Sequence, residues 1–253
     1  MKNTIGIVGS GMIGGQTARL AIAGGYDVVI CNSRGPSSLV DLVKELGPQA
    51  RAATLPEVAA AADLIVLAIP FAVFATIPAD VLAGKILIDT LNYYPERDGD
   101  MMEVHTDTVS TSELVQRHFA RSTVVRALNN VDFVRLLTSA REAGDADRSA
   151  LPVAGNDADA KSQVISFLDG IGYDFVDMGD LAQAWRSEPT MPIYVEPYMT
   201  PETNYVAKQV TLDTFLAAPG RTVSKQEAAN LIAKAVRHDK MFGKLPVFAN
   251  ADT

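Results

Sequence analysis

Several kinds of residue and segment are scarce in this sequence, and each scarcity excludes a class of protein. The 253-residue chain has one cysteine, Cys31, so it has no internal disulfide and no cysteine-rich metal site. A strand pattern begins by residue 4, which leaves no room for a signal peptide, and no apolar run reaches membrane-spanning length. The formal net charge is -8, without a basic stripe for a nucleic-acid backbone. We expect a cytoplasmic protein that binds neither membranes nor nucleic acids.

Histidine is also scarce, and the three histidines do not assemble into a site. We expect His105, His118 and His238 to be solvated rather than to act as ligands or general bases, and we expect no metal. Hydride transfer between two stacked rings needs proximity and orientation more than an acid or base, because the cofactors carry the chemistry. The sequence is therefore compatible with a redox reaction of that kind.

The most informative motif is a glycine-rich turn between an apolar run and a helical pattern. Gly9, Gly11 and Gly14 form G-x-G-x-x-G: the first permits a tight turn, the second lets a pyrophosphate approach the backbone, and the third lets helix and strand pack closely. The intervening Ser10, Met12 and Ile13 place free N–H groups of the helix start toward the anion. We predict a dinucleotide site here.

The end of the second predicted strand indicates which dinucleotide is bound. An NAD site usually has Asp or Glu about 20 residues after the glycines, whereas this chain has Asn32-Ser33-Arg34. Ser33 can donate to a phosphate oxygen, and the Arg34 guanidinium suits a dianion. Ser37, behind Pro36, could add a further donor. We predict NADP(H), with an ordinary exposed loop arginine as the alternative.

Apolar strand patterns alternate with helical patterns along the chain, which favours a doubly wound parallel sheet in an α/β fold. Cys31 fits a small apolar filler at a strand end. Helices are expected over 12–23, 37–46 and from Thr54 onward, and residues 141–150 as a polar loop. The expected strands are 4–8, 28–31, 50–53, 64–69, 85–89, 123–128, 151–154 and 173–176.

Ligands of such sheets lie beyond the carboxyl ends of the strands. Ile69, Pro70 and Phe71 follow the fourth strand and could form an apolar wall beside the nicotinamide. Asn129 follows the sixth and could pair with the carboxamide or orient a reacting ring; alternatively, it caps a helix over 132–138. Asp89, Tyr93 and Tyr94 follow the fifth strand, where structural roles are favoured.

Six segments together resemble the NADPH-dependent coenzyme F420 reductase family, over roughly residues 1–195. They are Gly9-Ser10-Gly11-Met12-Ile13-Gly14, Asn32-Ser33-Arg34-Gly35-Pro36, Ala68-Ile69-Pro70, Arg126-Ala127-Leu128-Asn129, Val153-Ala154-Gly155-Asn156-Asp157 and Met178-Gly179-Asp180-Leu181.

The resemblance implies a Rossmann-type domain over residues 1–180 and a small helical C-terminal part over 181–253. It implies hydride transfer between NADP(H) and coenzyme F420, with FMN or FAD as further candidate acceptors. Residues 10–13 would hold the pyrophosphate, 33–34 the 2'-phosphate, and 69–71 the nicotinamide side. Residues 129–133, including Val131 and Phe133, would lie between the two rings. The family has a histidine and a proline-containing turn after the sixth strand, where this chain has Asn129-Asn130-Val131-Asp132.

The C-terminal part carries the remaining candidates. Trp185, Arg186 and Tyr194 could form the far wall of the second-substrate pocket, although core packing is an equal alternative for Trp185. Ser224 to Glu227 is a capping box before a helix to about His238, whose apolar stripe favours packing on its own core over a dimer contact or lid.

Three functions remain open from the sequence. They are a homodimeric reductase of a deazaflavin or flavin-like acceptor, an NADPH-dependent reductase of a small imine or ketone, and a non-catalytic NADPH-sensing module.

Overall fold

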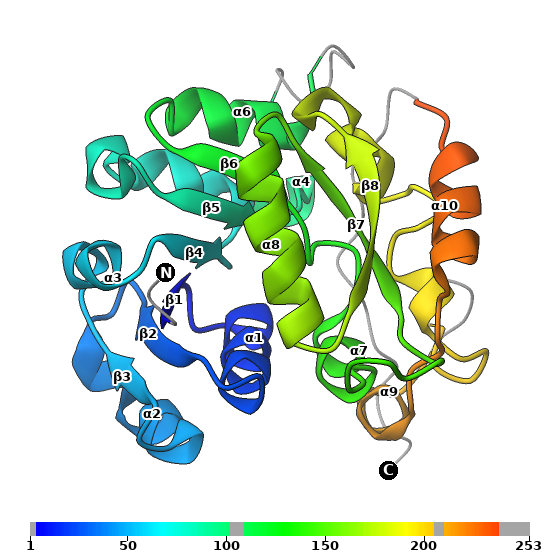
Figure 1. The fold of residues 1–253 in the computed structure, drawn as a ribbon, viewed down its shortest axis with the longest axis horizontal. Coiled ribbons are helices and arrows are strands. Elements are labelled where there is room, and N and C mark those ends of the chain that lie inside the picture. The colour runs from blue at the N-terminus through cyan, green and yellow to red at the C-terminus, as the bar shows by residue number, and fades with distance from the viewer. Residues whose placement is uncertain (1–3, 102–108, 205–209, 238–253) are drawn as a thin grey trace.

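Eight strands form one sheet in the order β3-β2-β1-β4-β5-β6-β7-β8 (Figure 1). The computed structural model describes residues 4–101, 109–204 and 210–237. The strands are β1 (Thr4–Val8), β2 (Asp27–Cys31), β3 (Ala50–Ala52), β4 (Leu64–Leu67), β5 (Ile86–Asp89), β6 (Thr123–Arg126), β7 (Ala150–Gly155) and β8 (Asp174–Gly179). The first six are mutually parallel, and the strand order reverses between β1 and β4. This is the doubly wound α/β fold that the sequence predicts.

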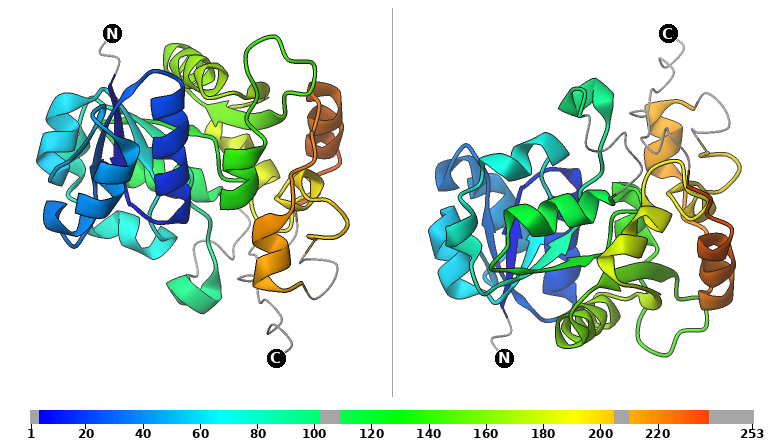
Figure 2. Two further views of the ribbon diagram at one scale, coloured as in Figure 1. Left: turned by 90° about the horizontal axis from the view of Figure 1, so that it is seen from below. Right: turned by 90° about the horizontal axis from the view of Figure 1, so that it is seen from above.

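Helices cover both faces of the sheet (Figure 2). The α-helices are α1 (Met12–Ala23), α2 (Val40–Leu46), α3 (Leu55–Ala61), α4 (Pro95–Asp98), α6 (Thr111–His118), α7 (Phe133–Thr138), α8 (Ala158–Gly170), α9 (Leu212–Ala217) and α10 (Lys225–Ala233). The 3-10 helices are η1 (Pro36–Leu39), η2 (Phe71–Thr76), η3 (Ala79–Leu82), η4 (Leu181–Ser187) and η5 (Glu196–Tyr198). The expected helix over 37–46 is thus divided into η1 and α2.

Local sequence explains where two of the helices begin. α3 starts behind Thr54, and α6 starts behind Ser110; each forms a capping box with a glutamate three residues later. The core lies on both sides of the sheet. One cluster joins the strands to α1 and α8, and the other joins them to α3 and α6. The alternating side chains of each central strand are therefore buried on both faces, as in other parallel sheets.

One strand direction differs from the sequence-based prediction. β7 runs antiparallel to β6, with Arg126 opposite Ala154, and then pairs parallel with β8. β7 is the exception to the parallel sheet that the sequence predicts, because a buried apolar run has no direction of its own. The connection sets the direction: α7 and the loop over 139–149 return the chain to the same edge of the sheet.

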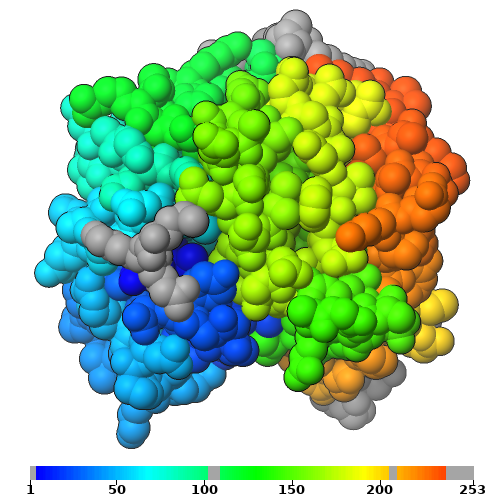
Figure 3. Space-filling model, viewed as in Figure 1, coloured from blue at the N-terminus to red at the C-terminus, as the bar shows by residue number. Residues whose placement is uncertain are grey.

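The segment after β8 packs against the same sheet (Figure 1). α10 contacts β7 and β8, and its Ala228 and Ile232 are buried in the main core cluster. Its apolar stripe therefore packs on the chain's own core, and its N-cap is Ser224, as expected. In the space-filling view, the orange segment lies directly against the yellow one, and the yellow segment against the yellow-green one (Figure 3). A domain boundary at residue 180 stays a prediction.

None of the described helices is long and apolar enough to cross a bilayer.

Candidate functional site

Two of the three motif glycines are required by the packing of the fold itself. Gly9 has a φ of 108°, and a Cβ built on it would lie 2.1 Å from the carbonyl oxygen of Ala68. A Cβ on Gly14 would lie 2.0 Å from the carbonyl oxygen of Gly9. The start of α1 therefore packs backbone to backbone against the carboxyl ends of β1 and β4, as the motif predicts.

Gly11 differs from the other two glycines because no protein neighbour explains it. Its φ of -72° suits any residue, and a Cβ built on it has no atom of the described residues within 4 Å. It is the N-cap of α1, and no side chain in the described part of the chain caps that helix. Its neighbour Met12 is 65% exposed. Exposed, uncapped N–H groups beside an open backbone fit a pyrophosphate.

Asn32 organises the loop after β2. Its side-chain amide donates to the hydroxyls of Ser10, at 3.0 Å, and Ser38, at 2.9 Å. Its side-chain oxygen accepts from the backbone N–H of Arg34 at 3.0 Å. The side chain therefore links the glycine turn to the loop and closes an Asx turn. Asn32 is expected to contact the cofactor, and in the structure its side chain positions the neighbouring residues.

Three predicted phosphate-binding residues lie exposed on that loop. Ser33, Arg34 and Ser37 all have solvent-accessible side chains. The Arg34 guanidinium forms neither a hydrogen bond nor an ion pair with the residues that the structure describes. In a chain whose other arginines mostly pair with carboxylates or carbonyl groups, this leaves Arg34 available for an external anion.

The residues of the apolar wall predicted beside the nicotinamide, 69–71 after β4, differ in exposure. Ile69 is half-buried and Pro70 is exposed, so both can face a ligand. The Phe71 ring is fully buried and packs edge-on against Phe74 and Tyr93, with ring centroids 5.0 and 5.8 Å apart. The assignment of Phe71 to the cofactor wall needs correction: its side chain belongs to the core that supports Ile69 and Pro70.

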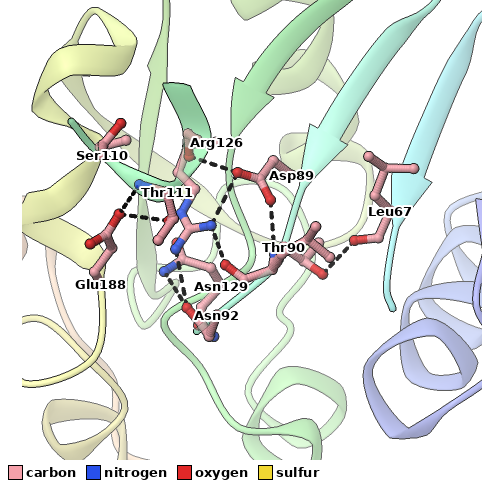
Figure 4. A network of polar contacts seen from close by, with 12 residues as sticks. Leu67, Asp89, Thr90, Asn92, Ser110, Thr111, Arg126, Asn129 and Glu188 are labelled. Carbon is pink, nitrogen blue, oxygen red and sulfur yellow. Dashed lines mark hydrogen bonds and ion pairs between the residues drawn. The ribbon is translucent and has the colours of Figure 1, made fainter. Parts of the chain in front are cut away.

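A buried polar network fixes the ends of β5 and β6 beside this wall (Figure 4). Arg126 and Asp89 face each other across the two strands at 3.1 Å, and both side chains are completely buried. Arg126 also donates to the carbonyl oxygen of Leu91 and, at 3.1 Å, to the side-chain oxygen of Asn92. One guanidinium therefore holds the chain as it leaves β5. Sequence analysis missed this role, although an arginine within an apolar strand is the signal for it.

Asn129 is bound within the same network. Its side-chain nitrogen donates to the carbonyl oxygen of Ser187 at 2.6 Å and to Asn92 at 3.3 Å, and its side-chain oxygen accepts from the Ser187 hydroxyl at 3.1 Å. Only 3% of the residue is exposed. Asn129 thus orients neighbouring segments in this structure and makes no open donor–acceptor pair. The alternative as an N-cap was wrong: α7 is capped by Asp132, which accepts from the backbone N–H groups of Val134 and Arg135.

Glu188 is a second buried carboxylate near Arg126 and was not expected from the sequence. It accepts from the backbone N–H of Thr111 at 2.7 Å and from the Thr111 hydroxyl at 2.6 Å, at the start of α6. Burial raises the pKa of Glu188, and the positive charge of Arg126 and the Thr111 hydrogen bonds oppose this effect. Nothing in the pattern around Glu188 marks it as buried, because its partners come from distant parts of the chain.

Trp185 and Arg186 anchor the C-terminal helix. The Arg186 guanidinium lies 4.5 Å from the Trp185 ring and donates at 3.4 Å to the carbonyl oxygens of Ile232 and Ala235, at the end of α10. Trp185 is buried against Met191 and Ala235. Trp185 thus packs within the protein, the alternative that the sequence left open for it, and Arg186 is engaged by carbonyl groups at a helix end, where a cation is favoured.

The other predicted second-substrate residues lie in two different environments. Val131 is buried in the main core cluster, and the half-buried Phe133 lies 5.8 Å from the ring of Phe215. Tyr194 differs from them: its hydroxyl contacts that of Tyr94, on the segment that follows β5. The structure thus brings Tyr194 from a distant part of the chain to the β5 and β6 ends.

The histidine and cysteine expectations have mixed outcomes. His118 is not simply solvated: its Nε2 lies 2.8 Å from the carbonyl oxygen of Ile77, and its ring packs against Phe74 and Phe119. His105 and His238 lie outside the described residues. Cys31 is buried, which raises the pKa of its thiol to about 11 and suits an apolar filler. Within the described ranges, no His, Cys, Asp and Glu cluster could hold a metal ion.

A surface hollow at the opposite edge of the sheet does not compete with this site. It is lined by Asp27, Gln49 and Arg51, among others, at the amino ends of β1, β2 and β3. Ligands of open α/β sheets bind at the carboxyl ends, where the glycine turn and the network lie.

Comparison with known proteins finds a matching family and similar solved structures. Residues 4–93 match the family described as NADP oxidoreductase coenzyme F420-dependent. No curated protein sequence matches the chain. Among solved structures, a proposed F420-dependent NADP-reductase from Arthrobacter sp. FB24 is 31% identical; the match covers 73% of this chain and 87% of that one, with a TM-score of 0.59.

Two further structures show how far the fold is shared. A hypothetical protein from Sinorhizobium meliloti is 27% identical, with 76% of this chain and 92% of that one covered and a TM-score of 0.67. An imine reductase from Pseudomonas sp. is 19% identical, with 71% and 56% covered and a TM-score of 0.52. The likeness to the imine reductase is one of fold alone.

The two kinds of motif glycine are expected to respond differently to substitution. Gly14→Ala should destabilise the protein by about 1 to 3 kcal/mol, because the added Cβ overpacks the turn. Gly11→Val should leave stability nearly unchanged and abolish nucleotide binding, because the side chain occupies the open space beside the helix start. Thermal unfolding and NADPH titration of both variants test this. A well-folded Gly11→Val protein with ordinary NADPH affinity would show that the motif is only a turn.

Arg34 is expected to select NADPH over NADH. Loss of a charge-assisted phosphate contact costs on the order of 1.5 to 3 kcal/mol, or about 10- to 150-fold in affinity. Arg34→Ala should weaken NADPH binding by that order and leave NADH binding nearly unchanged. Titration of both nucleotides into both proteins is the measurement, with the exposed Arg51→Ala as a control. Equal losses for the two nucleotides would contradict the assignment.

Glu188 is expected to make folding stability depend on pH. Because its folded pKa is raised, the folded protein binds the Glu188 proton more tightly than the unfolded chain does. The free energy of unfolding should therefore decrease as pH rises from the unfolded value through the folded one, by about 1.4 kcal/mol per unit of pKa elevation. Glu188→Gln, which retains an oxygen for Thr111, should lack this decrease. Urea unfolding of both proteins across that range measures it, and a pH-independent difference between them would refute it.

Proposed function

This chain belongs to the coenzyme F420-dependent family of NADP oxidoreductases, and we propose that it transfers hydride between NADP(H) and a deazaflavin or flavin-like acceptor. The observation that carries the nucleotide half of the proposal is the open space at Gly11 beside the uncapped start of α1. The acceptor half rests on the family and on the surroundings of the β5 and β6 ends.

The residues present fit an NADP molecule from end to end. Arg34, Ser33 and Ser37 would hold the 2'-phosphate, and the N–H groups at the start of α1 would hold the pyrophosphate. Ile69 and Pro70 would border the nicotinamide, whose reduced form supplies a hydride when bound. The protein's own part is then binding and orientation, which can supply much of the rate enhancement of such a reaction.

The carboxyl ends of β5 and β6 are the proposed place of the second substrate. Asn92 and Asn129 tie the two ends together, with Asn92 donating to the carbonyl oxygen of Asn129 at 2.8 Å. Because Asn129 also bonds Ser187, the segment after β8 is held at the same position. Asn129 therefore acts as a positioning residue in this proposal. A homodimer with a small-molecule acceptor is part of the same proposal.

Direct transfer predicts that a label moves from nucleotide to acceptor. Deuterium at one C4 face of NADPH should appear in the reduced acceptor and not in the solvent. The assay compares deazaflavin, FMN and FAD with small imines and ketones, using mass spectrometry to locate the label. Turnover of imines or ketones alone would favour a small-substrate reductase, and nucleotide binding without any turnover would favour a sensing module.

Asn129→Ala should lower turnover in the same assay, because a misplaced ring reacts slowly, while NADPH affinity changes little. A titrating limb lost from the pH profile of this variant would point instead to an acid–base mechanism and to a small imine or ketone as the substrate.

A further inference from the structure

Two tyrosine hydroxyls meet beyond the ends of β5 and β6, the proposed place of the acceptor. Tyr94 stands five residues beyond the end of β5, and its hydroxyl contacts that of Tyr194. Tyr194 is held at the end of β6, because the neighbouring Val195 N–H donates to the carbonyl oxygen of Asn130 at 2.8 Å. The Asn130 side chain donates in turn to the carbonyl oxygen of Ile193 at 3.1 Å. The pair thus bridges two strand ends that no local sequence relation connects.

Other buried tyrosines of the described chain have a different environment. The Tyr93 hydroxyl donates to the carbonyl oxygen of Gly99 at 2.8 Å, within the core. Tyr198 donates to the carbonyl oxygen of Ala150 at 2.8 Å, and Tyr173 to that of Leu136 at 2.6 Å. Each of these hydroxyls is committed to a backbone acceptor. The Tyr94 hydroxyl contacts another hydroxyl, which can donate to it and leave the Tyr94 proton for a third group.

The charges around Tyr94 suit a group that gives up a proton and takes it back. The Arg97 guanidinium lies 5.0 Å from the centre of the Tyr94 ring, and the Tyr94 backbone N–H donates to Asp98 at 2.9 Å. Burial raises the pKa of Tyr94, whereas the Tyr194 hydrogen bond, Arg97 and Arg126 lower it and Asp98 raises it. The phenol is therefore protonated at neutral pH, and two cations stabilise its anion once the proton has left.

We propose that Tyr94 is the proton donor to the second substrate, with Tyr194 as the hydroxyl that returns a proton to it. The proposal rests on the proposed hydride transfer. It narrows the acceptor to a compound whose reacting carbon is double-bonded to, or conjugated with, a nitrogen or oxygen. The reacting carbon accepts the hydride, and the electron pair of the hydride forms the new C–H bond. The displaced π electrons settle on the nitrogen or oxygen, which takes the Tyr94 proton. Tyr194 reprotonates the phenolate, and solvent restores Tyr194.

The chain offers a matched control for this role, because Tyr93 and Tyr94 are adjacent and take the same substitution. Tyr93→Phe removes a structural hydroxyl, and Tyr94→Phe removes the proposed donor. With saturating NADPH and deazaflavin, Tyr94→Phe should lower kcat by roughly 100-fold or more, the usual contribution of a general acid. Tyr93→Phe should keep kcat within about 3-fold, and the KM for NADPH should change little in both.

A binding measurement gives a readout that does not depend on turnover. Fluorescence titration of oxidised deazaflavin into the NADP+ complex should show affinity about 2- to 10-fold weaker for Tyr94→Phe than for Tyr93→Phe, because one hydrogen bond to the acceptor is lost. Tyr194→Phe keeps the donor and should lower kcat less than Tyr94→Phe does.

The possible failures can be told apart. If the unaltered protein turns over no acceptor, the proposed function is wrong. If it turns over deazaflavin while Tyr94→Phe matches Tyr93→Phe in both kcat and deazaflavin affinity, the proton donor is wrong and the proposed function stands. A larger loss of kcat in Tyr194→Phe than in Tyr94→Phe would also overturn the assignment of Tyr94.

Discussion

The buried Arg126 guanidinium is the interaction on which the site depends. It pairs with Asp89 inside the sheet and reaches the carbonyl oxygen of Leu91 and the side chain of Asn92, which lie beyond the strand end. Removing one partner of a buried ion pair typically costs about 3 to 5 kcal/mol, because the other charge is left uncompensated. The same interaction that completes the core thus sets the path of the chain beside the proposed nicotinamide wall. A substitution of Arg126 or Asp89 would therefore change both the stability of the fold and the geometry of the site.

Much of the nucleotide half could be predicted from sequence because its determinants are local. The glycine turn needs its residues for reasons of backbone space, which the structure confirms at Gly9 and Gly14. The absence of a carboxylate after β2 and the presence of Arg34 are likewise local facts. The helix starts expected at Thr54 and Ser224 are correct for the same reason, since Thr54 forms a capping box and the Ser224 hydroxyl accepts from the Glu227 N–H.

The features that sequence analysis missed depend on contacts between distant segments. Asn129 is tied to Ser187, 58 residues away, and Glu188 to Thr111, 77 residues away. A polar residue after a strand looks the same whether it faces a ligand or another segment of the chain. The direction of β7 has a similar origin, since the connection determines it and the strand residues do not. Arg186 shows the same limit, because the carbonyl groups that it caps belong to a helix 46 residues further on.

The attachment of α10 through Trp185 has a spectroscopic consequence. Trp185 is the single tryptophan of the chain, and it lies in a small cluster with Met191 and Ala235. The guanidinium groups of Arg186 and Arg237 lie 4.5 and 5.6 Å from the centre of its ring. Its emission therefore reports the local polarity at this one junction. Detachment of α10 would expose the indole to water and shift its emission. The protein thus contains an intrinsic optical probe of how α10 is held.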